Sequence, residues 1–125
     1  MDSPFEDHFQ VDKKLAAEAA KKILDFYHDD PSRWTKDAYA RDKDGKSCLQ
    51  WAPEAVCWCL DGARAVLHLS YGTRSGRTQV MGPAFHLSRR ITELTDRNGL
   101  VGLNDQKGST FETVQSVLGQ IAGKA

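Results

Sequence analysis

The sequence lacks the features that mark membrane, fibrous and disulfide-rich proteins. The longest apolar run among its 125 residues, around Ala65–Leu69, is far shorter than the roughly 20 residues that a membrane-spanning helix requires. No basic and apolar leader precedes Asp2, so we expect a cytoplasmic protein. Repeats and linker-like segments are also missing, and 40% of the residues are hydrophobic. A chain of this length can bury one core without a covalent staple, which predicts one soluble domain.

Cysteine is scarce, and its number is odd: Cys48, Cys57 and Cys59 are the only three. This pattern in a chain without an export signal indicates reduced thiols. Cys57 and Cys59 would point to different sides of a helix, and the four histidines show none of the short spacings of zinc ligands. The segment 72–78 is one residue too short between its glycines for a nucleotide-binding loop and has Arg where Lys is needed. We therefore expect no metal and no cofactor.

Acidic residues are absent between Gly62 and Thr92, although the whole chain carries no net charge. The same segment contains five arginines, namely Arg64, Arg74, Arg77, Arg89 and Arg90. One interpretation is a set of solvated side chains that pair with acids elsewhere in the fold. The other is a basic patch that receives an acidic partner or phosphates, because the guanidinium group suits planar oxyanions.

Apolar spacing predicts a mainly α domain of about four helices. Asp12 is placed to cap the first helix, and Asp29-Asp30-Pro31 ends it. The others are expected at 53–67, at 83–98 with Asn98-Gly99 as a left-handed stop, and after the apparent capping box at 109–112. Residues 1–10 are expected to form a flexible N-terminal arm and residues 11–125 a single helical domain.

Three segments between the helices have their own patterns. Residues 34–51 fit a short β-hairpin or an ordered loop between the first two helices, because Asp44-Gly45 suits a two-residue hairpin turn. Residues 70–83 are expected to form a mobile loop, and residues 100–103 an extended connector followed by an Asn104-Asp105 turn. We expect Trp34, Trp51 and Trp58 to pack against the helices, since an exposed tryptophan would mark an interface.

Cys59, His86 and Asp105 are the candidates for catalysis. A cysteine followed by a histidine and an Asx residue supplies the ingredients of a Cys-dependent hydrolase or transferase. On the predicted second helix, however, Cys59 lies on the apolar face and beyond the first turn, where a thiol packs as a small hydrophobe. Packing is the favoured interpretation, and with it a protein that is not an enzyme.

Three motifs resemble those of a bacterial and phage family of small proteins of unknown function. The first comprises Trp34, Ala38, Arg41 and Gly45, and the second is a Trp-Cys-x-x-Gly-Ala helix formed by Trp58, Cys59, Gly62 and Ala63. The third comprises the Asn-Asp pair Asn104-Asp105 followed by Thr110 and Val114. Leu60 and Leu103 stand where that family has Ala and Trp. The resemblance implies an architecture for residues 11–122, and it implies no reaction, cofactor or catalytic residue.

The sequence therefore favours a small interaction or regulatory protein of bacterial or phage origin. It would bind the acidic surface of a protein partner through the Arg-bearing loop and its neighbours, Arg74, Arg77, Arg89, Arg90 and Trp58. The two alternatives are a Cys-dependent hydrolase or transferase that uses Cys59, His86 and Asp105, and a nucleic-acid-binding regulator that uses the same arginines.

Overall fold

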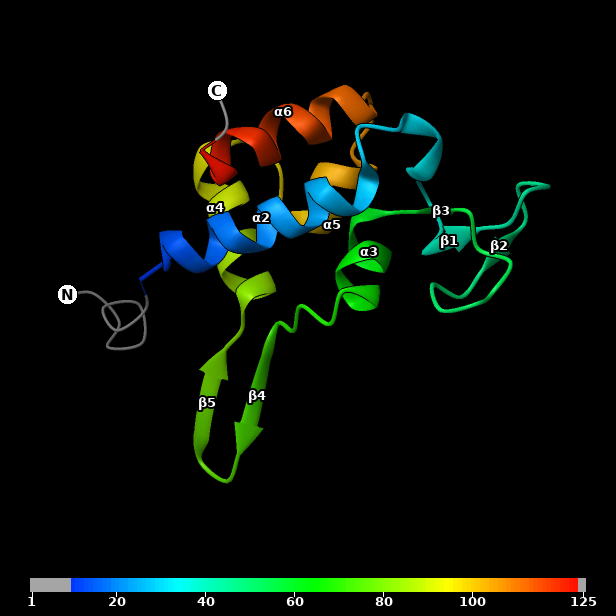
Figure 1. Ribbon diagram of the computed structural model, residues 1–125. Helices are drawn as coiled ribbons and strands as arrows, with labels where there is room; N and C mark the ends of the chain where they lie inside the picture. Colours follow the sequence, from blue (N-terminus) through cyan, green and yellow to red (C-terminus); the bar gives the residue numbers. More distant parts are fainter. Residues whose placement is uncertain (1–9, 124–125) are drawn as a thin grey trace.

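The computed structural model describes residues 10–123, which form a mainly α domain with two small β-sheets (Figure 1). Within this range there are five α-helices, where the sequence predicts about four. They are α2 (Lys13–Tyr27), α3 (Leu60–Val66), α4 (Pro83–Leu94), α5 (Gly99–Asp105) and α6 (Phe111–Ala122), and a short 3₁₀ helix, η1 (Pro31–Arg33), follows α2. Apart from Gln10, the expected N-terminal arm lies outside the described residues.

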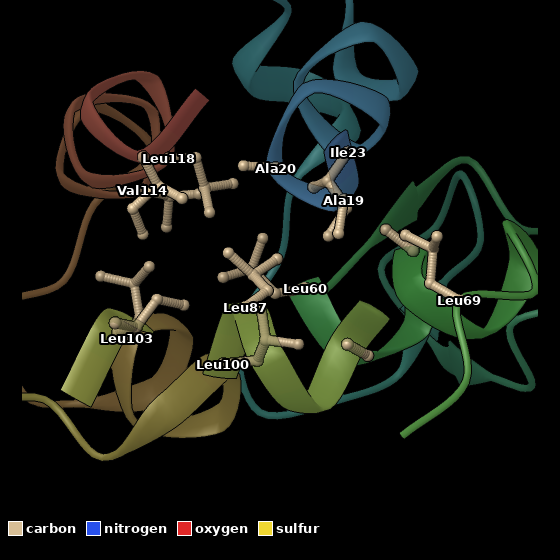
Figure 2. Packing of buried hydrophobic residues seen from close by; sticks show 14 of the residues in the cluster. Ala19, Ala20, Ile23, Leu60, Leu69, Leu87, Leu100, Leu103, Val114 and Leu118 are labelled. Carbon is tan, nitrogen blue, oxygen red and sulfur yellow. The ribbon is translucent and has the colours of Figure 1, made fainter. Parts of the chain in front are cut away.

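Helix α2 packs against both α4 and α6 and carries the centre of the core. It begins as predicted, because the Asp12 carboxylate accepts the backbone N–H groups of Lys14 and Leu15. Its buried face is rich in small side chains, so the neighbouring helices can approach closely. Figure 2 shows Ala19, Ala20 and Ile23 of α2 between leucines of α4, α3 and α6. The helix ends at Tyr27, before the Asp29-Asp30-Pro31 sequence, with His28 in the left-handed region.

The segment between α2 and α3 forms a three-stranded antiparallel sheet in the order β2-β1-β3. Its strands are β1 (Ala40–Arg41), β2 (Ser47–Cys48) and β3 (Cys57–Trp58). The turn between β1 and β2 differs from the predicted two-residue turn, because Asp42 N–H bonds Lys46 O and so leaves three residues in the loop. Gly45 has a φ of 80° there, the left-handed conformation that closes such a loop. A short hairpin is thus present within residues 34–51, but its turn differs from the expected one and β3 extends it into a three-stranded sheet.

The predicted helix over residues 53–67 is wrong in its first half. Only Leu60–Val66 is helical, and residues 57 and 58 form β3, which pairs with β1. Val56, inside the predicted helix, is 47% exposed and so is not part of a buried helical face. The backbone N–H of Cys59 instead donates to Tyr39 O, so strand pairing continues up to the first residue of α3. Cys59 is thus the residue that caps α3 and does not lie beyond its first turn.

Residues 70–83, expected to be an irregular loop, contain a regular hairpin. Its strands are β4 (Gly72–Ser75) and β5 (Thr78–Met81), paired from Gly72↔Met81 to Ser75↔Thr78. The turn has Gly76 at its first central position with a φ of 60°, as a type II′ hairpin turn requires. The dipeptide Gly76-Arg77 was therefore the sequence signal for the β4–β5 hairpin. This hairpin lies between α3 and α4 and is longer than the β1–β2 hairpin.

The expected extended connector at residues 100–103 is helix α5. Leu100 and Leu103 are both fully buried, and their spacing places them on one helical face. Gly99 does adopt the left-handed conformation, with a φ of 70°, but it begins α5, since α4 ends earlier, at Leu94. The last helix also starts one residue later than predicted, because the reciprocal cap joins Thr110 to Thr113.

The three tryptophans have different surroundings. Trp34 and Trp58 pack against the core as expected, and Trp58 lies edge-on to Phe26. Trp51 is 62% exposed and Leu49, in the same turn, is 69% exposed, so the expected burial of Trp51 is wrong. No helix within residues 10–123 is long and apolar enough to cross a membrane.

Candidate functional site

The buried side-chain amide of Asn104 joins three segments that are distant in the sequence. Its Oδ1 accepts the indole N–H of Trp34 at 2.6 Å and the backbone N–H of Leu60 at 3.0 Å. Its Nδ2 donates to Thr35 O at 3.2 Å and to Asp105 Oδ1 at 2.7 Å. Asn104 is 1% exposed, and these four bonds use both of its amide protons and the oxygen. The pair Asn104-Asp105 lies in the last turn of α5. The predicted turn at these two residues is therefore wrong.

Asp105 continues this network to the surface. Besides the amide of Asn104, its Oδ1 accepts the backbone N–H of Asp37 at 3.3 Å. Asp37 has a φ of 63°, in the left-handed region that aspartate tolerates better than most residues. Asp105 therefore fixes the path of the chain between η1 and β1.

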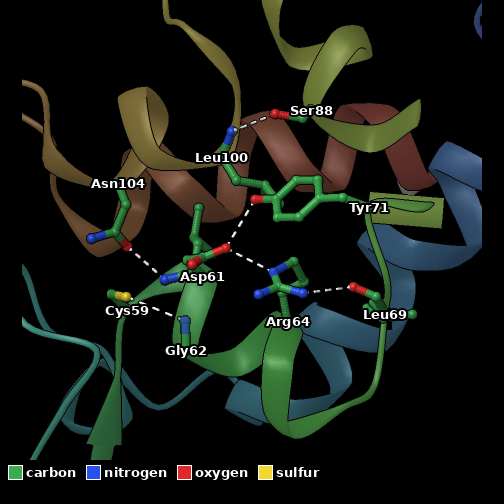
Figure 3. A network of polar contacts seen from close by, with 10 residues as sticks. Cys59, Asp61, Gly62, Arg64, Leu69, Tyr71, Ser88, Leu100 and Asn104 are labelled. Atoms are coloured by element: carbon green, nitrogen blue, oxygen red, sulfur yellow. Dashed lines mark hydrogen bonds and ion pairs between the residues drawn. The ribbon is translucent and has the colours of Figure 1, made fainter. Parts of the chain in front are cut away.

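Helix α3 presents its first turn to the same region, as Figure 3 shows. The Cys59 sulfur accepts the backbone N–H of Gly62 at 3.3 Å, and Asn104 satisfies the N–H of Leu60. Gly62 is required here, since a Cβ at this residue would collide with the backbone carbonyl oxygen of Tyr39. The absence of a side chain at Gly62 thus lets α3 lie directly against the chain at Tyr39.

The Cys59 thiol is buried, with 7% of the residue exposed. Burial raises the pKa of this thiol, the backbone N–H donors of Gly62 and Asp61 oppose that shift, and the carboxylates of Asp105 and Asp61 add to it. The shift moves the thiol away from the thiolate, which is the form that acts as a nucleophile. Cys59 therefore has the properties of a packing and capping residue.

Asp61 is the centre of a second polar cluster. Its Oδ1 accepts Arg64 Nε at 2.7 Å and the Tyr71 hydroxyl at 2.9 Å. Arg64 also stacks over the Tyr71 ring, at 4.5 Å from the centroid, and donates to Leu69 O. Burial and the hydrogen bond to Asp61 raise the pKa of Tyr71. This cluster ties α3 to the chain that leads into β4.

A cavity of about 350 Å³ lies between these groups. Three carboxylates, those of Asp37, Asp61 and Asp105, contribute to its lining. The remaining lining residues are Ala38, Tyr39, Cys59 and Val101. Tyr39 and Val101 are each 54% exposed, and Asp37 and Asp105 are exposed as well, so apolar side chains and carboxylates both reach the mouth of the cavity. We refer to these seven residues as the acidic cavity.

The structure separates the three catalytic candidates. Cys59 and Asp105 line the acidic cavity together. His86 Nδ1 accepts the backbone N–H of Asp12, at the start of α2. At the end of α2, the Tyr27 hydroxyl donates to the carbonyl of Trp58, the neighbour of Cys59. A helix of 15 residues is about 22 Å long, so His86 and Cys59 lie near opposite ends of α2.

The predicted binding residues also fall into separate groups. Arg74 on β4 and Arg77 in the turn are exposed on the hairpin. Arg89 is exposed on α4, and Arg90 beside it pairs with Glu93 at 3.2 Å. Trp58 is committed to the interior, since its Nε1 donates to Gln50 O and Arg33 stacks on its ring. The hairpin therefore holds the most accessible part of the predicted patch.

Figure 1 shows the β4–β5 hairpin extending away from the helices. Within residues 10–123, no further strand pairs with β4 or β5, so both outer edges of the ribbon lack a strand partner. Arg74 and Gln79 are paired and share one face, whereas Thr73 and Val80 share the other. Val80 is 58% exposed. We refer to residues 72–81 as the basic hairpin.

Sequence reasoning missed the roles of Asn104, Arg64 and Tyr71. Asn104 had a usable signal, because an Asn-Asp pair directly after two leucines three residues apart can close a helix as well as a turn. Arg64 had a local signal in its i, i+3 spacing from Asp61, whereas the contact of Tyr71 with Asp61 depends on the chain reversal after α3. Over the described part of the chain, no group of three or more His, Cys, Asp or Glu side chains is arranged to hold a metal ion.

Comparison with known proteins gives one match. The sequence profile of a family of unknown function (DUF6197) matches residues 16–124, which is most of the chain. No curated protein and no solved structure matches.

Proposed function

Since the chain belongs to DUF6197, a family of unknown function, we propose its function from the geometry of its own residues. We propose that it is a small, non-enzymatic interaction protein that presents the basic hairpin to an acidic surface of a protein partner. In this proposal it acts as a regulatory protein. The motif resemblance supports an origin in a bacterium or its phage.

The projection of the basic hairpin is the observation that carries the proposal. A two-stranded ribbon is marginal by itself and gains stability when a partner covers it. Arg74 and Arg77 are exposed there, and no acidic residue lies between Gly62 and Thr92 to neutralise them locally. Guanidinium groups form bidentate hydrogen bonds with carboxylates, which suits an acidic protein surface.

Binding to a labelled glutamate-rich peptide tests the proposal by fluorescence anisotropy. We expect the double variant Arg74→Glu/Arg77→Glu to weaken binding by about tenfold or more, because it reverses both exposed charges on the ribbon. The control Lys21→Glu/Lys22→Glu makes the same change of net charge on the exposed side of α2 and should bind as the natural sequence does. Equal binding by both double variants, or no binding by the natural sequence, would contradict the proposal.

A nucleic-acid partner is the second candidate, because a two-stranded ribbon also fits the major groove of duplex DNA. The same measurement with a short labelled duplex distinguishes the two. Tighter binding of the duplex than of the peptide, with an affinity that falls steeply as salt increases and is lost in Arg74→Glu/Arg77→Glu, would favour DNA. Weak duplex binding that is the same in Arg74→Glu/Arg77→Glu and in Lys21→Glu/Lys22→Glu would favour the protein partner.

A further inference from the structure

The acidic cavity has free acceptor atoms as well as negative charge. The hydrogen bonds that reach Asp61 and Asp105 from the described residues all use Oδ1 of each carboxylate. Asp105 is exposed and Asp61 is half-buried, so their Oδ2 atoms remain for donors from outside. Asp37 adds a third, exposed carboxylate.

The basic hairpin has the complementary features. It offers two exposed guanidinium groups, on Arg74 and Arg77, and the apolar Val80 lies on the face opposite Arg74. The acidic cavity offers the carboxylates of Asp37 and Asp105 at its exposed margin. None of the residues that line the cavity comes from the hairpin of the same chain. The charge of the hairpin arginines on one copy is thus complementary to the carboxylates of the acidic cavity on another copy.

We propose that the basic hairpin of one copy docks on the acidic cavity of a second copy of this chain. This inference rests on the proposed function and identifies the partner. In a twofold dimer the contact occurs twice, because each copy both gives a hairpin and receives one. With zero net charge, no overall repulsion opposes the approach of two copies.

The size of the contact suits a reversible dimer. Hairpin and cavity together supply about 17 residues of each copy, just under the 20–30 residues a side of a standard stable interface. The charged groups stay partly hydrated, so salt weakens their attraction. We therefore expect dissociation in the micromolar range and a dimer that loosens as ionic strength rises.

Sedimentation equilibrium of the full chain over a range of concentrations measures this dimer. We expect a concentration-dependent dimer at about 50 mM salt that weakens by about tenfold or more at about 500 mM. The hairpin variant Arg74→Glu/Arg77→Glu should be monomeric. The cavity variant Asp37→Asn/Asp105→Asn keeps the acceptor oxygens and removes two charges, so it should fold normally and dimerise about tenfold more weakly. Lys21→Glu/Lys22→Glu should dimerise like the natural sequence.

A mixture of the two variants distinguishes docking from a loss of folding. The hairpin variant retains a natural cavity, and the cavity variant retains a natural hairpin. Mixed dimers therefore regain one of the two natural contacts, and we expect the hairpin variant, monomeric when alone, to enter dimers when the cavity variant is added. A hairpin variant that stays monomeric in the mixture would overturn the proposal, as would a natural sequence that stays monomeric at low salt.

The outcomes separate this inference from the proposed function. A monomeric natural sequence that still needs Arg74 and Arg77 to bind the glutamate-rich peptide overturns the dimer and leaves the proposed function in place. A dimer that needs the hairpin arginines but is unchanged in Asp37→Asn/Asp105→Asn also overturns the inference, because the hairpin then docks elsewhere. A dimer that neither the hairpin variant nor the cavity variant weakens, together with peptide binding that does not need Arg74 and Arg77, overturns both proposals.

Discussion

Trp34 and Asn104 lie 70 positions apart in the chain and meet in a hydrogen bond of 2.6 Å between Nε1 and Oδ1. The same oxygen accepts the first backbone N–H of α3, and the amide nitrogen of Asn104 reaches back to Thr35. One buried side chain therefore holds η1, the start of α3 and the end of α5 in register. It also positions Asp105, the neighbouring carboxylate of the acidic cavity.

Replacing this amide should destabilise the fold strongly. In Asn104→Ala, the indole N–H of Trp34 and the N–H of Leu60 lose their acceptor in a buried place, and each such loss costs about 1–3 kcal/mol. We expect the free energy of unfolding in urea to fall by about 3 kcal/mol or more. Asn98→Ala is the matched control, because Asn98 is exposed and its side chain makes no capping hydrogen bond. A similar, small effect of both substitutions would contradict the role given to Asn104.

Alanine at two glycines should have opposite effects. A Cβ at residue 62 would meet the carbonyl oxygen of Tyr39, so Gly62→Ala has to push α3 away from β1. We expect a loss of about 2–3 kcal/mol, as for other overpacked sites. Gly119→Ala lies inside α6 with nothing within 4 Å of the new Cβ, and should stabilise the helix by about 0.5–1 kcal/mol. Thermal unfolding of the two variants measures both effects, and a neutral Gly62→Ala would refute the close approach.

Stability should decrease at high pH because of two tyrosines, with a contribution of the same sign from the buried Cys59 thiol, whose pKa is also raised. Burial raises the pKa of Tyr27, and burial with the hydrogen bond to Asp61 raises the pKa of Tyr71. Above the ordinary tyrosine pKa of about 10, the unfolded chain loses these protons while the folded chain keeps them, so alkali favours unfolding. The stabilisation is complete below that pH and declines above it, by up to about 1.4 kcal/mol per pH unit for each group. Urea unfolding between about pH 9 and pH 11 measures the slope.

The variant Tyr71→Phe identifies the source of that slope. It removes one of the two groups, so the decline with pH should become shallower, although the variant also loses the hydrogen bond to Asp61. A pH dependence that is the same in both proteins would show that Tyr71 does not contribute.

The Cys59 thiol should resist alkylation in the folded protein. Because burial raises its pKa and covers the sulfur, we expect iodoacetamide at about pH 8 to modify it at least about tenfold more slowly than in the urea-unfolded chain. The background Cys48→Ser/Cys57→Ser leaves Cys59 as the one reactive candidate, and mass spectrometry follows its modification. Fast labelling in the folded state would instead favour the Cys-dependent alternative.

Local sequence rules identified what depends on a few neighbouring residues. The Asp12 cap and the mainly α class both follow from side chains whose effect extends over one or two helical turns. The profile match confirms that the chain belongs to a family of unknown function, as the motifs around Trp58 and Asn104 imply. Bacterial or phage origin and the binding function remain proposals.

The wrong predictions at residues 53–59 and 100–103 share a physical cause, since each of these segments has partners outside its own stretch of the sequence. Residues 53–59 show helical spacing, yet Cys57 and Trp58 become a strand because β1 offers them backbone partners. Leu100 and Leu103 form one face of a helix because Ser88 Oγ accepts the backbone N–H of Leu100. Both leucine side chains also pack into the hydrophobic core formed by the other helices. The acidic cavity, assembled from three separate segments, could not be read from any one of them.

The reach of Asn104 has a consequence for the smallest unit that can fold. A fragment that ends before α5 would retain α2 and α3 but would lack Asn104. The indole N–H of Trp34 and the backbone N–H of Leu60 would then have lost their hydrogen-bond acceptor. Truncation at the hairpin therefore cannot yield an autonomous N-terminal half. Two co-expressed pieces cut at the exposed Gly76-Arg77 tip, by contrast, retain every one of these contacts and should reassemble.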